Sequence, residues 1–154
     1  KDGHLYVTGL LGWQTSPIRD GCLQRVRFTG ESIRQPIGMK IHANGIRLTF
    51  STALDKKIAE DIDSWSAEQW NYRWTAAYGS KDWSVKNPNK QGRDLIAIKN
   101  AKLLPDGKSV FLQIEKVAQV HSMAIQYNLD TAQGKIFKGT YNLTVNEVGK
   151  ALGK

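Results

Sequence analysis

The amino-acid sequence predicts an all-β protein: an antiparallel β-sandwich preceded by a short N-terminal β-hairpin. Two observations support this prediction. Short segments in which apolar and polar residues alternate recur along most of the 154 residues, and Gly, Asn, Asp and Pro stand between them. Almost no segment has the period of a helix. Short strands at regular spacing, separated by many turn signals, are typical of a sandwich.

The first two expected strands, residues 4–8 and 22–28, form the hairpin. A loop with Pro17 is expected between them, at residues 13–21. Cys22 lies in an alternating strand, so we expect it to be a small buried side chain. A two-stranded hairpin is not stable alone in water. Residues 31–38 resemble a linker, and we therefore expect a hairpin and linker over 1–36 and a sandwich over 37–154.

The sandwich begins with a second hairpin, in which Asn44-Gly45 is a strong turn signal between residues 39–42 and 46–50. One helical turn is expected within residues 54–61. The later strands are expected at residues 95–104, 110–114, 123–129 and 136–145, with turns at 105–107 and 133–134.

An aromatic stretch, residues 65–83, holds four of the five tryptophans and two of the five tyrosines. Trp70, Tyr72 and Trp74 stand at i, i+2 and i+4, which places three rings on one face of a β-strand. Such a row either packs in a core or forms a flat platform for a ligand, and the sequence leaves both interpretations open. A long polar loop is expected next, at residues 79–94.

The platform interpretation defines a candidate site for sugar rings or for a neighbouring domain. Polar side chains near the rings, at Asn71, Arg73, Lys81 and Asp82, would supply directional hydrogen bonds to a carbohydrate. The candidate ligand-binding residues are Trp65, Trp70, Tyr72, Arg73, Trp74, Tyr78 and Trp83.

Charge and hydropathy exclude several classes of partner. The net charge is +8, but Lys and Arg are scattered singly, so we expect no nucleic-acid partner. No apolar run approaches the roughly 18 residues of a membrane span. The single cysteine allows no internal disulfide. We expect a monomer.

The sequence holds no recognised metal or catalytic motif. The side chains with atoms suited to copper are His4, Cys22, Met39, His42, His121 and Met123. They lie far apart, and we expect His42 and His121 to be solvated at strand edges. The acidic residues between 55 and 63 lack the order of a calcium loop. G-x-S-x-G, H-E-x-x-H and phosphate-binding glycine loops are absent from the sequence, so we expect no metal, no cofactor and no catalytic residue.

Several motifs carry a resemblance to a known family. They are I-R-L-T-F-S-T-A-L-D, A-E-D at 59–61, L-L-P-D-G-K-S-V-F-L-Q-I and I-Q-Y-N-L-D-T-A-Q-G-K. Together they resemble an immunoglobulin-like domain of the bacterial surface-layer type, over roughly residues 37–146. The resemblance implies an immunoglobulin-like sandwich of about seven strands.

The opening of the chain carries a second resemblance. D-G-H-L-Y-V-T-G-L-L-G-W-Q-T and C-L-Q-R-V-R-F-T-G, with W-N-Y-R-W and Y-G-S-K-D-W-S-V, resemble a segment of large exported bacterial proteins. In those proteins a glucose/sorbosone-dehydrogenase-like β-propeller precedes an immunoglobulin-like segment, and a c-type cytochrome domain often follows. On this resemblance, residues 1–30 are the closing strands of a propeller.

The resemblance implies a secreted or periplasmic location and adjacent domains of the parent chain as partners. It also implies an accessory, non-catalytic module of a sugar-oxidising protein that presents an aromatic face to a polysaccharide, an oligosaccharide or a neighbouring domain. The alternative is a fragment of a quinoprotein-type sugar dehydrogenase with a redox or metal role. No catalytic residue carries over, because the sequence has no C-x-x-C-H and lacks the propeller body.

Overall fold

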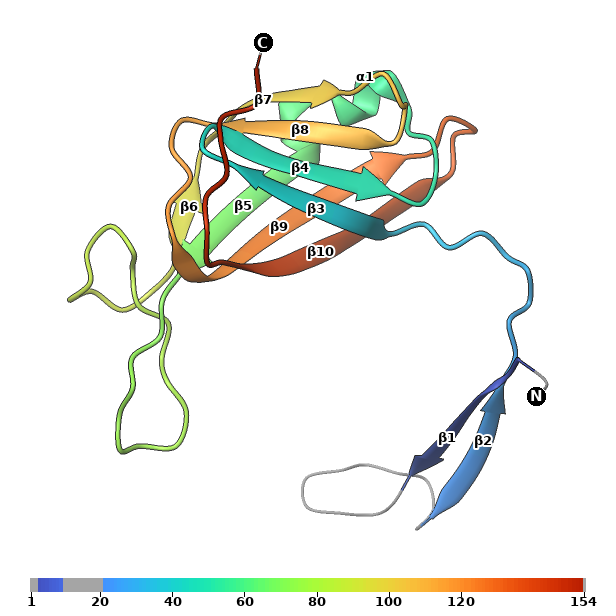
Figure 1. The fold of residues 1–154 in the computed structure, drawn as a ribbon, viewed down its shortest axis with the longest axis horizontal. Helices are drawn as coiled ribbons and strands as arrows, with labels where there is room; N and C mark the ends of the chain where they lie inside the picture. Colours follow the sequence, from blue (N-terminus) through green and yellow to red (C-terminus); the bar gives the residue numbers. More distant parts are fainter. Residues whose placement is uncertain (1–2, 10–20, 154) are drawn as a thin grey trace. The chain divides into compact units, whose positions relative to one another are not determined.

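The computed structural model describes residues 3–9 and 21–153, and the chain forms two compact units, Lys1–Ser32 and Ile33–Lys154 (Figure 1). In the first unit, β1 (Leu5–Gly9) pairs antiparallel with β2 (Cys22–Val26). Cys22 is exposed, so the prediction that it is buried is wrong, because the described part of this unit offers no second layer to cover it. The loop expected at residues 13–21 lies almost entirely outside the described residues.

The second unit is a sandwich of two four-stranded antiparallel sheets (Figure 1). Their orders are β3-β4-β8-β7 and β10-β9-β5-β6. This is the A-B-E-D and G-F-C-C′ arrangement of immunoglobulin folds, so the predicted fold class is confirmed. The strands are β3 (Pro36–His42), β4 (Gly45–Phe50), β5 (Trp65–Trp70), β6 (Asp94–Ile96), β7 (Ile98–Leu103), β8 (Ser109–Ile114), β9 (Val120–Asp130) and β10 (Ile136–Val145).

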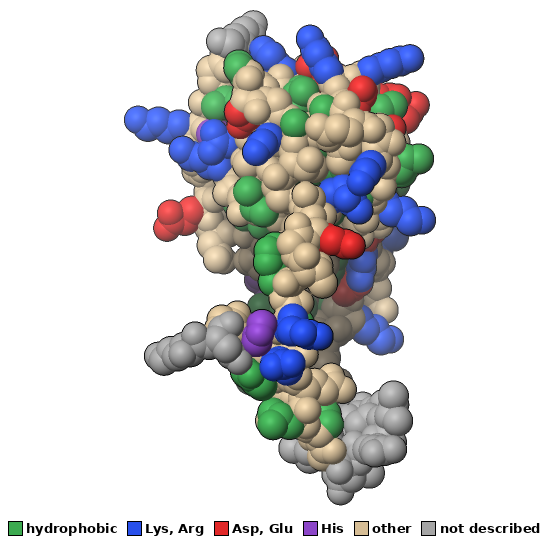
Figure 2. All heavy atoms as spheres, turned by 90° about the vertical axis from the view of Figure 1, so that its right-hand side faces the viewer, with side chains coloured by type: hydrophobic (Ala, Val, Ile, Leu, Met, Phe, Trp, Pro, Cys, Tyr) green, Lys and Arg blue, Asp and Glu red, His purple; other side chains and the backbone are tan. Residues whose placement is uncertain are grey.

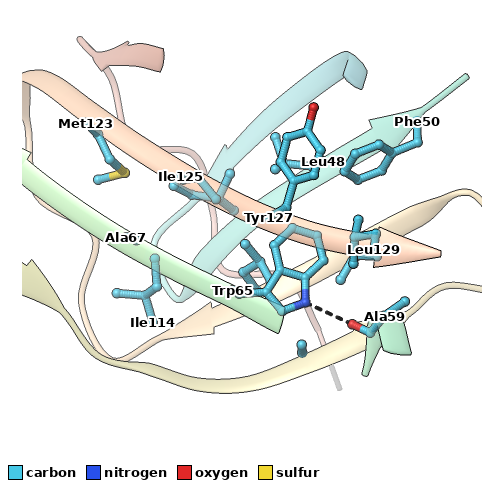
Figure 3. Packing of buried hydrophobic residues seen from close by; sticks show 14 of the residues in the cluster. Leu48, Phe50, Ala59, Trp65, Ala67, Ile114, Met123, Ile125, Tyr127 and Leu129 are labelled. Carbon is cyan, nitrogen blue, oxygen red and sulfur yellow. Dashed lines mark hydrogen bonds between the residues drawn. The ribbon is translucent and has the colours of Figure 1, made fainter. Parts of the chain in front are cut away.

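The core lies between the inner faces of the two sheets. Alternate residues of β4, including Leu48 and Phe50, are fully buried, as the alternation predicts. The Phe50 ring meets Trp65 and Tyr127 with centroid distances of 6.2 and 5.3 Å. The Trp65 side chain is 6% exposed, and its Nε1 donates a hydrogen bond to the Ala59 carbonyl at 3.0 Å (Figure 3). Trp65 is therefore a core residue.

Two short helices, α1 (Lys56–Ala59) and the 3-10 turn Ile62–Ser64, connect β4 to β5. Asp55 caps α1 by accepting from the Ile58 amide at 3.0 Å. Asp61 accepts from the Asp63 amide at 3.0 Å. These carboxylates therefore stabilise helix ends. Within residues 3–9 and 21–153, no three His, Cys, Asp or Glu side chains gather as a metal site, and no helix is long and apolar enough to cross a membrane.

Two expectations about strand boundaries are corrected. The single strand expected at 95–104 is divided at Ala97 into β6 and β7, which belong to different sheets, because the chain crosses between the layers there. The turn between β3 and β4 consists of Ala43 and Asn44, and Gly45 opens β4. A Cβ at Gly45 would collide with the Phe111 ring and the Leu112 carbonyl, so β8 requires glycine there.

His42 is buried at 6% exposure, so the expectation that it is solvated is wrong. The C-terminal segment covers it: the Ala43 amide donates to the Gly149 carbonyl at 3.0 Å, and His42 Nδ1 lies 2.9 Å from the Lys150 carbonyl oxygen. His121, by contrast, is exposed on β9.

Candidate aromatic binding loop

The candidate site is the loop between β5 and β6, residues 71–93, which we call the aromatic loop. The pairing of β5 with β9 stops at Trp70, and Asn71 instead exchanges two backbone hydrogen bonds with Trp83, both of 2.8 Å. Tyr72 and Trp74 consequently lie outside the strand. The predicted row of three rings on one strand face is therefore wrong, and the loop begins eight residues earlier than expected. Figure 1 shows it leaving the sandwich as two lobes.

His121 of β9 anchors the start of the loop. Its backbone amide donates to Asn71 Oδ1 at 2.9 Å, and its Nδ1 accepts from the Tyr72 amide at 3.2 Å. The rings of Tyr72 and His121 lie 4.2 Å apart between centroids. Asn71 therefore serves the loop's own structure, although the sequence suggested it as a sugar-binding group.

The first lobe carries two completely exposed rings. The Arg73 amide donates to Ser80 Oγ at 2.9 Å and so closes the neck of the lobe. Trp74 and Tyr78, which lie between these two residues, are each 100% exposed. Tyr72, at the neck, is 55% exposed.

The second lobe, residues 84–91, is organised by the Asp94 carboxylate. It accepts from the Ser84 hydroxyl at 2.7 Å, from the Val85 amide at 2.7 Å and from the Lys86 amide at 2.9 Å. Burial favours a higher pKa for Asp94, but the hydrogen bonds from Lys86, Ser84 and Val85 together outweigh it, so its pKa lies below the ordinary value.

Two arginines cover the tryptophans at the base of the loop. The Arg93 guanidinium lies 3.8 Å from the centre of the Trp70 ring, and Arg73 lies 3.8 Å from that of Trp83. Arg93 also forms ion pairs of 2.6 Å with Asp82 and 2.5 Å with Glu68. The hydrogen bond to Asp82 contributes most to raising the Arg93 pKa, followed by that to Glu68.

Arg73 connects the two lobes. Its Nη2 donates to the Pro88 carbonyl, and to Asn89 Oδ1 at 3.3 Å. With the Arg93 ion pairs and the Asn71–Trp83 backbone pair, these contacts fix the base of the loop while its tip stays exposed.

The seven predicted site residues therefore separate into three groups. Trp65 belongs to the core and takes no part in the loop. Trp70, Trp83 and Arg73 form the base, where each indole is half-buried and has one face under a guanidinium. The rings of Tyr72, Trp74 and Tyr78 are accessible. Asp82 is occupied by Arg93 rather than offered to a ligand.

The half-buried Trp70 borders a hollow of about 350 Å³ on the outer face of the β10-β9-β5 sheet. Its polar lining comes from Ser122, Asn142 and Thr144, which present hydroxyl and amide groups. A larger hollow of about 610 Å³ on the same sheet, near Ser66 and Gln126, is bordered by two aromatic residues, Trp65 and Tyr127, whose rings are mostly buried. Accessible rings therefore lie at the aromatic loop rather than at the larger hollow.

Comparison with known proteins gives little further information. No family model and no curated protein matches the chain. Among solved structures, the crystal structure of CopC from Methylosinus trichosporium OB3b is 13% identical, with a TM-score of 0.41 over 79% of this chain and 99% of that one. A similarity this low carries no functional argument.

Proposed function

We propose that this chain is a non-catalytic accessory module that binds carbohydrate through the aromatic loop. One observation carries the proposal: Trp74 and Tyr78 are fully exposed on a lobe whose neck is closed by a hydrogen bond. Two large rings without protein contacts on an ordered base are typical of a surface that stacks against a partner.

The base of the loop supports this proposal because it is held in place before a ligand arrives. Arg93, paired with Glu68 and Asp82, fixes the loop to β5, and Asp94 shapes the second lobe. Prior ordering lowers the entropy lost on binding. The hydroxyl and amide groups of the hollow beside Trp70 are suited to the hydroxyls of a sugar chain.

We further propose that the module belongs to an exported, multidomain sugar-oxidising protein and works outside the cytoplasm. The proposal rests on the sequence motifs that resemble such proteins. On the same basis, the β1–β2 hairpin would complete a sheet of a neighbouring propeller. Its exposed apolar side chains, such as Leu5 and Val26, support a partner domain there.

The test is a titration of the chain with oligosaccharides and soluble polysaccharides. Binding is measured by the change in tryptophan fluorescence and by the protection of the tryptophans from iodide quenching. We expect a saturable change that is at least about tenfold weaker in Trp74→Ala and in Tyr78→Ala, in keeping with the cost of losing a buried anchor. Ile136→Ala, which removes an exposed apolar side chain from β10, is the matched control and should bind normally. Unchanged affinity in both loop variants would refute binding through the aromatic loop, and no response to any glycan would refute carbohydrate binding altogether. Either result would leave the loop as a contact for a neighbouring domain.

A further inference from the structure

The charge of the aromatic loop is unbalanced. Between Asn71 and Asp94 the sequence holds five basic and two acidic residues. This stretch of 24 residues therefore carries +3 of the net charge of +8 of the 154-residue chain. Figure 2 shows Lys and Arg side chains on another face of the molecule, with acidic side chains among them.

Both acidic groups of this stretch, Asp82 in the loop and Asp94 at the start of β6, are already paired. Asp82 is paired with Arg93, which also forms an ion pair with Glu68 of β5. Asp94 receives three hydrogen bonds from residues 84–86. No carboxylate of the loop is therefore left to neutralise its remaining cations.

Four cations in the described part of this loop have no carboxylate within 4.0 Å: Arg73, Lys81, Lys86 and Lys90. The Lys86 Nζ donates to the Leu95 carbonyl at 3.4 Å and so lies toward β6. Arg73 donates only to neutral acceptors, the Pro88 carbonyl and the Asn89 amide oxygen. Lys81 and Lys90 are exposed.

These cations lie beside the exposed rings. The Arg73 amide is bonded to Ser80, which Lys81 follows, and the Arg73 guanidinium is bonded to Asn89, which Lys90 follows. Arg73 therefore brings one lysine from each lobe to the neck that presents Trp74 and Tyr78. Uncompensated positive charge therefore lies near the neck of the lobe that carries the exposed rings.

From this arrangement we infer that the ligand is an acidic polysaccharide, in which carboxylate or sulfate groups alternate with stackable ring faces. The inference rests on the proposed carbohydrate-binding function and specifies its substrate class. Stacking on Trp74 and Tyr78 would serve any glycan, whereas Arg73, Lys81 and Lys90 favour an anionic one. Exposed charges interact over about 8 Å at physiological ionic strength, so binding should weaken as salt is added.

Two probes with the same backbone test the charge requirement: oligomers of polygalacturonate and their fully methyl-esterified counterparts. The whole chain is titrated with each at low and at high salt by calorimetry. We expect the free acid to bind at least about tenfold more tightly at low salt, and the difference to shrink at high salt because the surface charges are screened.

Two double variants locate the effect. Lys81→Gln with Lys90→Gln should reduce the preference for the acid about fivefold or more, in keeping with two exposed ion pairs. Lys102→Gln with Lys135→Gln removes the same charge from exposed positions elsewhere and should leave the preference unchanged. An equal loss in both double variants would show that net charge, rather than the loop, attracts the ligand, and would overturn the inference.

The two proposals fail in different ways. Equal, salt-insensitive binding of the acid and the ester, abolished by Trp74→Ala, would overturn the acidic-ligand inference and leave carbohydrate binding intact. If neither probe binds, nor any neutral glycan, then the proposed function itself fails.

Discussion

At the scale of single residues, Trp65 and Trp74 show that aromatic residues of one stretch have opposite roles. Trp65 begins β5 and points between the sheets, where its ring meets Phe50 and its Nε1 is paired with the Ala59 carbonyl. Trp74, nine positions later, is fully exposed. The first residue therefore supports the fold, and the second is free to contact a ligand.

Replacing Trp65 should destabilise the sandwich strongly. We expect Trp65→Ala to lower the free energy of unfolding by about 3–5 kcal/mol, because it leaves a cavity among packed rings. Trp65→Phe keeps a ring but leaves the Ala59 carbonyl without its partner, and should cost about 1–3 kcal/mol. Urea denaturation followed by circular dichroism measures both.

The matched control for Trp65 is Trp74→Ala. It removes the same side chain from a fully exposed position and should change the free energy of unfolding by no more than about 0.5 kcal/mol. Similar losses in Trp65→Ala and Trp74→Ala would mean that the exposed ring packs on the protein in solution.

At the scale of elements, the aromatic loop is held by polar contacts, whereas the strands are held by apolar burial. Asp94 illustrates this because its carboxylate accepts three hydrogen bonds from residues 84–86. Its pKa is lowered in the folded protein, so it contributes stability at pH values above its unfolded pKa of about 3.9. That contribution is lost as pH falls through the lower, folded pKa.

We therefore expect Asp94→Asn to be less stable than the unmodified chain by about 1 kcal/mol at pH 7, allowing for the partial exposure of this side chain. The difference should shrink at acidic pH, as the pH falls through the lowered pKa of Asp94 and the carboxylate of the unmodified chain takes up a proton. Denaturation at both pH values, with amide exchange of Val85 and Lys86, measures the global and the local effect. A difference that is equal at both pH values would show that the negative charge is not what holds the lobe.

The elements also show which features the sequence could predict. Alternation located β4, β9 and β10 because each buries one face more than the other, and a period of two follows from that burial. It also located β8, although Ser109 and Phe111 on the other face of that strand are buried as well. Alternation did not reveal the break at Ala97, because the apolar residues on its two sides, Ile96 and Ile98, belong to strands of different sheets. It also failed after Trp70, because the pairing of Asn71 with Trp83 decides where β5 ends.

The candidate site was predicted only in part, since its composition is local but its geometry is not. The exposed rings lie within the stretch that the sequence singled out. The residues that fix them were missed, because Arg93 is separated by 25 positions from Glu68, and His121 by 49 from Tyr72. Contacts between distant positions leave no mark in local periodicity or spacing.

At the scale of the whole molecule, the two units differ in how much they bury. The core cluster runs from Ile46 to Val145 and lies wholly in the second unit. In the described part of the first unit, Leu5, Val7 and Val26 share one face of the hairpin, and each is at least 42% exposed. The stability of the chain should therefore come from the sandwich.

A chain shortened to residues 33–154 tests this directly. It should unfold cooperatively, with a free energy within about 1 kcal/mol of the longer chain, because every core side chain is retained. A peptide of residues 1–32 should show no stable strand structure, because an isolated two-stranded hairpin is marginal in water. Circular dichroism and urea denaturation of the three chains give the comparison. A loss above about 2 kcal/mol in the shortened chain would show that the hairpin packs on the sandwich, because deleting only exposed segments costs far less.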